Sequence, residues 1–263
     1  MSIFDAAKRG TVERDVTYAV MGGRELKMDV YYPKSRGPWR GLIFIHGGGW
    51  SEGDKAPLAV VPSGYLVVSI NYRLYPEARF PAMIEDVKCA IRFLRAHAAA
   101  YNLDPTRIGL IGHSAGGHLA ALAGLVGPDA GWDVGPYLDQ SSTVQAVIEL
   151  SGPTDLTRHF ADDVNQLKAN VFGPDRLISS SPVTCVRRDA PPFLIVHGDA
   201  DVVVPVEQAH LLHADLSKAG ARVHKIILRN AGHGFEPVGG KVWPPFNWTV
   251  AVILLFLAWY LRK

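Results

Sequence analysis

One stretch of the sequence, residues 107–127 (RIGLIGHSAGGHLAALAGLVG), constrains the fold more than any other. It joins a β-rich apolar run to a helical pattern through GHSAG, in which glycines surround Ser114. Such a turn is so tight that only glycines leave room for it, and it holds the serine hydroxyl exposed in a strained conformation. The helix that follows points its first amides and the positive end of its dipole at that position. The stretch therefore predicts a strand–turn–helix with Ser114 as a nucleophile, against the alternative of a simple turn.

Short apolar runs and longer helical patterns alternate along most of the chain. Residues 81–103 show helical spacing, with apolar side chains at Ile84, Val87, Ile91 and Leu94. The β-rich runs are 42–45, 66–70, 107–111, 144–152, 192–200 and 223–233, and a second helical pattern covers 206–220. This alternation predicts an α/β protein with a mainly parallel central sheet and helices on both faces. The opening segment, with Gly22 and Gly23 at a turn, predicts an antiparallel hairpin at one edge.

The composition is typical of a soluble globular enzyme and excludes some other classes. The 263 residues, 48% apolar and 20% charged, suit a single domain over 1–263. A formal net charge of +2 without runs of like charge leaves no footprint for nucleic acid. Cys89 and Cys185 lack metal-ligand spacing, so we expect neither a metal site nor a cofactor, and Cys89 to be a core residue. The first residues contain no apolar leader segment, which favours a cytoplasmic protein.

Two segments break the alternating pattern. Residues 153–192 are polar, rich in proline and too long for a plain loop, which predicts a small helical cap or lid over the end of the sheet. Residues 247–262 are apolar on all sides, and Asn247 after two prolines is a candidate N-cap. Such a helix is too short for a bilayer span, so we expect it to be buried, either within one chain or in a homodimer. Membrane contact is the alternative that we favour less.

The HGGGW motif at 46–50 follows a strand and contains three consecutive glycines. Glycines let the backbone present amides to a neighbouring site, and a tetrahedral intermediate needs such donors. We expect the amides of Gly48 and Gly49 to join that of Ala115 in an oxyanion hole, and the amide of Gly47 is the next candidate donor. His46 precedes these glycines and is predicted to fix the loop by hydrogen bonding. The alternative is that the motif is only a flexible turn.

A serine nucleophile needs an imidazole base, and ten histidines are present. His233 lies in NAGHGF after the last β-rich run, where the base belongs in the chain order Ser, Asp or Glu, His. His113 and His118 flank Ser114 in sequence, but the backbone of the turn directs them elsewhere. Other histidines that we considered lack a motif context: His97, His159, His210, His213 and His224.

The acid that orients the base should lie between Ser114 and His233, at the end of a strand. The segment HGDADVVVP offers Asp199 and Asp201. Asp199 stands between small residues and can turn to solvent or to backbone amides. Asp201 runs into three valines, and a buried carboxylate needs a partner such as an imidazole N–H. Residue context favours Asp201 and leaves Asp199 as the alternative.

Four aromatic side chains near these motifs are candidates for lining a substrate pocket, although each could equally pack in the core. They are Trp50, Tyr72, Phe160 and Phe235.

Taken together, six segments resemble the serine carboxylesterases of the α/β-hydrolase fold. The most similar are the hormone-sensitive-lipase-like group and the related bifunctional feruloyl and acetyl-xylan esterases. The segments are HGGGW at 46, NYRLYPEARFPAMIEDV at 71, DPTRIGLIGHSAGGHLA at 104, SPV at 181, PPFLIVHGDADVVVP at 191 and GHGF at 232. They extend over nearly the whole chain. Two features depart from the family pattern: Tyr75 stands where relatives often carry a small residue, and the last helix is not amphipathic.

The resemblance implies a Ser114–His233–Asp201 triad, because the family's acid is the fourth residue after the His of an H-G-x-x-D pattern. It implies hydrolysis of small to medium carboxylic esters, small-molecule substrates that pass through an acyl-enzyme. A rival reading is an amidase of the kynurenine-formamidase type, which uses the same triad. Others are a catalytically inactive ligand-binding receptor on this fold and a membrane-tethered lipase.

Overall fold

The computed structural model describes residues 10–56 and 61–262. Eight strands of these residues form one sheet, in the order β1-β2-β4-β3-β5-β6-β7-β8. The strands are β1 (Val12–Met21), β2 (Arg24–Tyr31), β3 (Trp39–Ile45), β4 (Tyr65–Ile70), β5 (Leu103–His113), β6 (Ala146–Leu150), β7 (Phe193–Gly198) and β8 (Val223–Leu228). The predicted α/β architecture is confirmed.

The sheet is antiparallel only at its first edge. β1 and β2 form the predicted hairpin, and Gly22 and Gly23 turn it with φ of +59° and +78°. β2 runs antiparallel to β4, and from β4 onward every neighbouring pair is parallel. The carboxyl ends of β3, β5, β6, β7 and β8 therefore meet at one end of the sheet.

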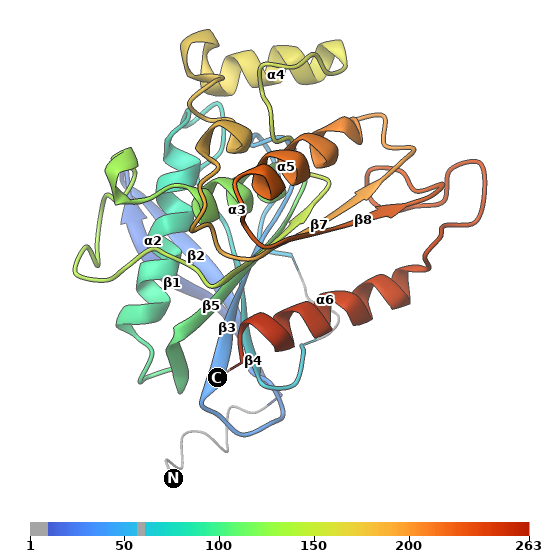
Figure 1. Ribbon diagram of the computed structural model, residues 1–263. Helices are drawn as coiled ribbons and strands as arrows, with labels where there is room; N and C mark the ends of the chain where they lie inside the picture. Colours follow the sequence, from blue (N-terminus) through green and yellow to red (C-terminus); the bar gives the residue numbers. More distant parts are fainter. Residues whose placement is uncertain (1–9, 57–60, 263) are drawn as a thin grey trace.

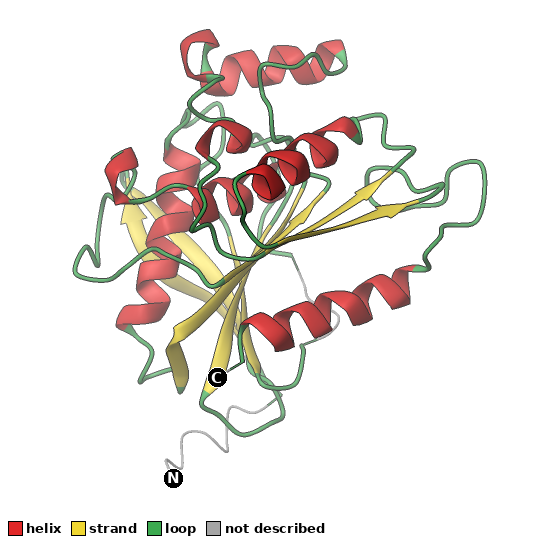
Figure 2. Ribbon diagram, viewed as in Figure 1, coloured by secondary structure: helices red, strands yellow, loops and turns green. Residues whose placement is uncertain are grey.

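Helices cover both faces of the sheet, but unequally (Figures 1 and 2). α2 (Ala82–Ala96), α3 (Ala115–Leu125) and α5 (Glu207–Lys218) lie on one face, over the larger apolar core. α2 buries the four apolar positions of its predicted stripe, and Cys89 is fully buried there as expected. Of the helices in residues 10–56 and 61–262, α6 (Phe246–Tyr260) is the one on the opposite face, over a smaller core.

The segment 153–192 contains an α-helix and two short 3₁₀ helices. They are α4 (Asp162–Phe172), η2 (Pro174–Arg176) and η3 (Pro182–Cys185). A further 3₁₀ turn, η1 (Pro128–Ala130), follows α3. η3 contacts α3 and α5, whereas α4 stands farther out from the sheet (Figure 1).

The last helix differs from its prediction in two respects. It begins at Phe246 with Pro245 as N-cap, so Asn247 lies inside the first turn instead of capping it. It is not fully buried: Phe256 and Leu257 pack against the sheet, while Trp248, Leu255 and Trp259 are exposed. A helix that is apolar on all sides does not indicate which side faces the core, so its burial within one chain is only partial. Burial of the remaining side in a homodimer stays a prediction. No helix in the described part of the chain is both long and apolar enough to cross a bilayer.

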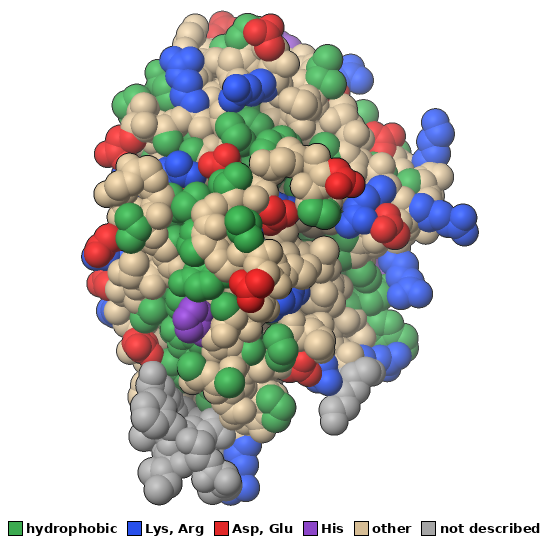
Figure 3. All heavy atoms as spheres, turned by 90° about the vertical axis from the view of Figure 1, so that its left-hand side faces the viewer, with side chains coloured by type: hydrophobic (Ala, Val, Ile, Leu, Met, Phe, Trp, Pro, Cys, Tyr) green, Lys and Arg blue, Asp and Glu red, His purple; other side chains and the backbone are tan. Residues whose placement is uncertain are grey.

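On the side of the molecule formed by the first edge of the sheet, the surface combines acidic, basic and apolar side chains. Figure 3 shows this side, where acidic and basic groups are scattered among apolar ones without a field of one sign. This view agrees with the small net charge of +2.

Candidate active site

Ser114 occupies the sharp turn between β5 and α3. Its backbone has φ 55° and ψ −122°, a strained conformation for a residue with a side chain. A Cβ on Gly112 would overlap the carbonyl of Gly116, and one on Gly116 would overlap the carbonyl of Ile45 at the end of β3. The two glycines are therefore required by close backbone contacts. The Ser114 amide donates to Leu150 O at 2.8 Å, which fixes the turn on β6.

Ser114, His233 and Asp201 form one hydrogen-bonded chain. The Ser114 hydroxyl Oγ lies 2.9 Å from His233 Nε2, and His233 Nδ1 lies 2.7 Å from Asp201 Oδ2. The serine ends β5, the acid follows β7 and the histidine follows β8, so the parallel strands bring all three to one end of the sheet. The arrangement can transfer the serine proton to an imidazole whose other nitrogen is held by a carboxylate.

Asp201 is buried and fully supplied with donors. Its Oδ1 accepts the amides of Val203 and Val204, both at 2.9 Å, and its Oδ2 accepts from His233 and faces His197 Nε2 at 3.3 Å. Burial raises the pKa of Asp201, but the hydrogen bonds from His197, His233 and the Val204 amide outweigh it and hold the pKa well below its usual value. The carboxylate therefore stays ionised beside His233.

Asp199 has a different environment from Asp201. It is exposed, and its Oδ1 accepts the Asn230 amide at 2.7 Å. It shapes the loop between β7 and the segment after β8, as the sequence predicts for this residue.

The HGGGW loop runs beside Ser114. A Cβ on Gly47 would lie 3.2 Å from Ser114 Cβ, so the loop backbone touches the serine. Gly48 and Gly49 have φ of +107° and +57°, a region that residues with side chains rarely adopt. Within the described residues, the amides of Gly48, Gly49 and Ala115 donate no hydrogen bond to a protein acceptor. These amides are thus available to bind an oxygen that carries negative charge.

His46 fixes this loop from behind. Its Nδ1 lies 2.6 Å from Gly47 O, and its ring stacks on Tyr72 with centroids 4.3 Å apart. The Tyr72 hydroxyl donates to His46 O at 3.1 Å. Burial lowers the pKa of His46, so the ring is neutral near pH 7. The predicted role of His46 in fixing the loop agrees with these contacts.

The structure places the four aromatic pocket candidates in packing roles. Trp50 is buried, donates to His118 Nδ1 at 3.2 Å and meets Phe172 edge-on. Tyr72 is buried against His46, and the buried Phe160 ring lies under Lys168 Nζ at 4.7 Å. Phe235 is half-buried and packs on His113 and on Phe246 of α6. Among the described residues, none of the four rings makes an aromatic contact or a hydrogen bond with Ser114, so their role as pocket lining stays a prediction.

Three further residues contact the site or the segments that hold it in place, and the sequence did not assign them to the site. His113 Nε2 lies 2.9 Å from His233 O, so the residue before the nucleophile holds the backbone of the base. His118 is fully buried, accepts from Trp50 and bonds Ser180 O at 2.8 Å, which ties α3 to the HGGGW loop and to the segment before η3. Leu167 of α4 covers Gly49, because its Cδ2 would lie 2.6 Å from a Cβ there. None of these contacts has a local sequence signature.

A buried polar cluster lies behind Asp201. Glu149 lies in β6 and Ser151 directly follows it, beside the strand that carries His197, and all three are fully buried. Among the described residues, Glu149 Oε2, Ser151 Oγ and His197 Nδ1 have no hydrogen-bond partner. His197 Nε2 faces two acceptors, Val204 O at 2.8 Å and Asp201 Oδ2, so this nitrogen carries the proton. Burial raises the pKa of Glu149 to about 7.

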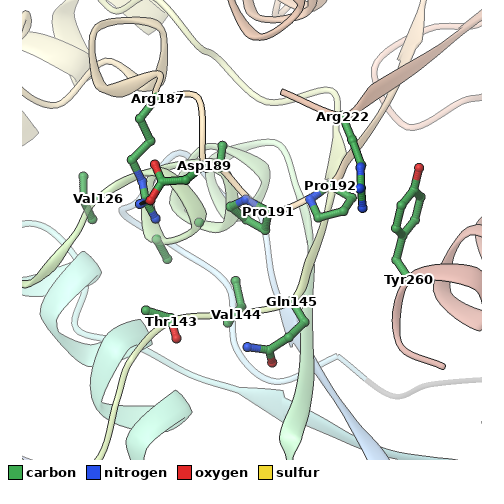
Figure 4. A pocket seen from close by; sticks show the side chains of 13 residues that line it. Val126, Thr143, Val144, Gln145, Arg187, Asp189, Pro191, Pro192, Arg222 and Tyr260 are labelled. Atoms are coloured by element: carbon green, nitrogen blue, oxygen red, sulfur yellow. Dashed lines mark hydrogen bonds and ion pairs between the residues drawn. The ribbon is translucent and has the colours of Figure 1, made fainter. Parts of the chain in front are cut away.

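A cavity of about 510 Å³ opens at the other end of the sheet, where β6 and β7 begin (Figure 4). Its wall includes Gln145, Pro192, Arg187 and Asp189, which lie far from the carboxyl ends of the strands. The candidate active site at Ser114 is therefore separate from this cavity. Within residues 10–56 and 61–262, no group of three or more His, Cys, Asp or Glu side chains could hold a metal ion.

A tight turn bearing a serine, followed in the chain by an acid and a histidine at strand ends, on a mainly parallel eight-stranded sheet, defines an α/β-hydrolase. The chain belongs to the BD-FAE family, whose model matches residues 28–216.

Relatives and solved structures agree with this assignment. The esterase LipQ of Mycobacterium tuberculosis is 35% identical over 84% of this chain and 57% of its own length. The chain thus spans about half the length of the curated relatives it matches. A truncated carbohydrate esterase from gut microbiota is 32% identical with a TM-score of 0.81, over 97% of this chain and 98% of that one. Esterase 2 of Thermogutta terrifontis, phosphonylated by sarin, is 26% identical with a TM-score of 0.77 over 94% of each chain, and a butyrate-bound form is also known.

Proposed function

We propose that this chain is a serine carboxylesterase that hydrolyses small to medium carboxylic esters through an acyl-enzyme. The observation that carries the proposal is the hydrogen-bonded chain from Ser114 Oγ through His233 to Asp201, with distances of 2.9 and 2.7 Å. The names of the relatives support it, and so does the reaction of a structural neighbour with sarin, a phosphonylating agent.

In the proposed mechanism, Ser114 Oγ attacks the ester carbonyl while His233 Nε2 accepts the hydroxyl proton. Asp201 keeps the proton of His233 on Nδ1 and stabilises the imidazolium that forms. The amides of Gly48, Gly49 and Ala115 bind the oxyanion of the tetrahedral intermediate. His233 then protonates the leaving alcohol. In the second half-reaction His233 takes a proton from water, which attacks the acyl carbonyl. The bond between the acyl carbon and Ser114 Oγ then breaks, His233 returns the proton to Oγ, and the acid is released.

We propose that the segment 153–192 acts as a cap that limits the size of the substrate. Leu167 of α4 lies directly on Gly49, one of the proposed oxyanion donors, so α4 restricts space above the reacting carbonyl. Trp50, the last residue of the same loop, packs edge-on against Phe172 of α4. These contacts favour short acyl groups, in line with the butyrate bound by the neighbouring esterase.

A panel of p-nitrophenyl esters of increasing acyl length tests this proposal, with a Ser114→Ala variant as control. We expect a burst of p-nitrophenol equal to the enzyme concentration, and a kcat/KM that falls beyond short acyl chains. Faster turnover of an N-formyl aryl amide than of the matching aryl ester would instead favour the amidase. Turnover of neither substrate, without a burst, would favour the inactive receptor.

A cytoplasmic location stays a prediction. Both cysteines are free thiols, which agrees with a reducing compartment. Fractionation of cells that produce the chain would test it.

A further inference from the structure

α6 has a second apolar side that the protein does not cover. Phe256 and Leu257 bury one side of the helix against the sheet. On the other side, Trp248, Leu255 and Trp259 are 48%, 69% and 58% exposed. Their spacing of seven and four residues places them in one stripe along the helix.

We call this exposed stripe of Trp248, Leu255 and Trp259 the α6 patch. Two further apolar side chains, Trp243 before the helix and Phe246 in its first turn, are 62% and 54% exposed. A groove of about 450 Å³ between α6 and β8 continues the α6 patch, with Ile226 and His224 on the far wall. Five of the twelve strongly exposed large apolar side chains of the described residues thus lie within 243–259. A contiguous apolar surface of this kind marks an interaction site.

Basic residues outnumber acids in the last part of the sequence, and three of them, Arg222, Arg229 and Arg262, lie beside α6 or the segment that leads into it. Lys225 is not among them, because it lies against His210 of α5 on the opposite face. From Ala219 to Lys263 the sequence holds six Lys and Arg residues against one acid, Glu236, a formal charge of +5 in a chain whose total is +2. Arg229 is paired through its backbone with Trp243, and the Arg262 guanidinium lies 3.7 Å from the Trp259 ring centroid. Arg222 lies across from Tyr260 of α6 in Figure 4.

These cations lack acidic partners. No acid in the described part of the chain lies within ion-pair distance of Arg222, Arg229, Lys241 or Arg262, and all four are exposed. By contrast, the other side of the sheet pairs its cations closely, as Arg73 with Asp86 and Arg92 with Asp133. The surface around α6 is therefore complementary to a negatively charged partner.

We propose that the α6 patch binds the surface of an anionic lipid bilayer, with α6 lying in the plane of the membrane. Tryptophan side chains favour the interface between headgroups and acyl chains, and nearby Lys and Arg bind anionic headgroups. A second copy of this chain would offer an apolar face but would bring two unpaired positive rims together. A bilayer meets both requirements, apolar contact and negative charge. α6 with 15 residues, about 22 Å, rests on the membrane and does not span it.

Vesicle co-sedimentation of the full chain tests the proposal. The two vesicle types are pure phosphatidylcholine and an equal mixture of phosphatidylcholine and phosphatidylglycerol. We expect the chain to bind the mixed vesicles at least ten times more tightly, and to be released by about 0.5 M NaCl, which screens headgroup contacts. Equal binding to both vesicle types, or binding to neither, would overturn the proposal.

Two pairs of substitutions separate the apolar and the charged contributions. Leu255→Ser with Trp259→Ser should reduce binding to the mixed vesicles at least tenfold. The matched control, Leu138→Ser with Ile178→Ser, changes equally exposed side chains elsewhere and should leave binding unchanged. Arg229→Gln with Arg262→Gln should weaken binding about 25-fold, at about fivefold for each cation.

Each variant should unfold within a few degrees of the wild type, because the changed side chains are exposed. Light scattering during size-exclusion chromatography tests whether a second copy of the chain, instead of a bilayer, covers the α6 patch. A dimer that Leu255→Ser with Trp259→Ser dissociates, together with weak vesicle binding, would show that a second copy covers α6 and would contradict the proposal.

Discussion

Asp201 is the residue on which the proposed proton transfer depends most. Its carboxylate accepts four donors and is held ionised, and one of the four is the Nδ1–H of His233. Asp201→Asn would place an amide there, and the imidazole would be held in the wrong tautomer. We expect turnover to fall by about 10⁴-fold, as such changes do. Steady-state hydrolysis of p-nitrophenyl acetate measures it.

Asp199→Asn is the matched control, since Asp199 is two residues away but exposed and bonded only to a loop amide. Turnover within about twofold of the wild type is expected for a change outside the proton-transfer chain. A large loss for Asp199→Asn together with a small one for Asp201→Asn would reverse the assignment.

Glu149 links the buried cluster to the stability of the protein. Burial raises its pKa from 4.5 to about 7, so the folded state retains a proton that the unfolded state releases between these values. The group's contribution to stability is therefore complete below about pH 4.5 and is lost as pH rises through about 7. From pH 4.5 to pH 8 the free energy of unfolding of Glu149→Gln should fall about 3 kcal/mol less than that of the wild type. Urea unfolding at several pH values measures the difference.

The exposed Glu25 on β2 provides the comparison for Glu149. Glu25→Gln removes one acid without burial and should keep the pH dependence of the wild type. If Glu149→Gln also kept it, Glu149 would not be the group that loses its proton in this range.

At the scale of single elements, the turn between β5 and α3 depends on close backbone contacts that leave no room for a side chain. A Cβ on Gly116 would overlap the carbonyl oxygens of Ile45 and His46, and the backbone cannot yield without moving Ser114. Gly116→Ala should lower stability by about 1–3 kcal/mol, the usual cost of overpacking, and should reduce esterase activity further. Thermal unfolding and initial rates measure both effects.

Gly127→Ala is the control for this substitution. Gly127 follows α3 with φ −81°, and a Cβ there meets no atom within 4 Å. It should leave the melting temperature and the initial rate nearly unchanged. A melting temperature of Gly116→Ala equal to that of Gly127→Ala would show that the turn can relax.

The elements with local signatures could be predicted from the sequence, whereas contacts between distant elements could not. Ser114 has its glycines, His233 its place after the last strand and Asp201 its valines, so each was found separately and the parallel sheet brings them together. Glu149 meets the site only across strands and Leu167 only from α4, and no spacing in the chain encodes those contacts. Trp50 and Tyr72, candidates for pocket lining or for core packing, are both buried in the structure.

At the scale of the whole molecule, α6 is the one helix of the described residues that covers its face of the sheet. Leu257 is fully buried against that face, and Leu255, two residues earlier, is exposed. Leu257→Ala should lower the free energy of unfolding by about 2–5 kcal/mol, because it leaves a cavity in the smaller core. Leu255→Ala should change it by less than about 0.5 kcal/mol. Urea unfolding of the two variants would contradict the orientation of α6 if the larger loss came from Leu255→Ala.

Composition alone does not reveal how charge is distributed along the chain. The total charge of +2 conceals +5 in the last 45 residues and −3 in the rest. The proposed active site lies at the carboxyl ends of the strands. Phe246, in the first turn of α6, packs on Phe235, two residues after His233, so α6 begins beside the segment that carries the base.

Labelling of the full chain with a fluorophosphonate, followed by intact mass and peptide mapping, tests the central claim that Ser114 is a nucleophile activated by His233. We predict one adduct for each chain, located on Ser114, that is absent from Ser114→Ala and forms much more slowly in His233→Ala. Absence of an adduct on the folded wild-type protein, or an adduct on another residue, would contradict the account.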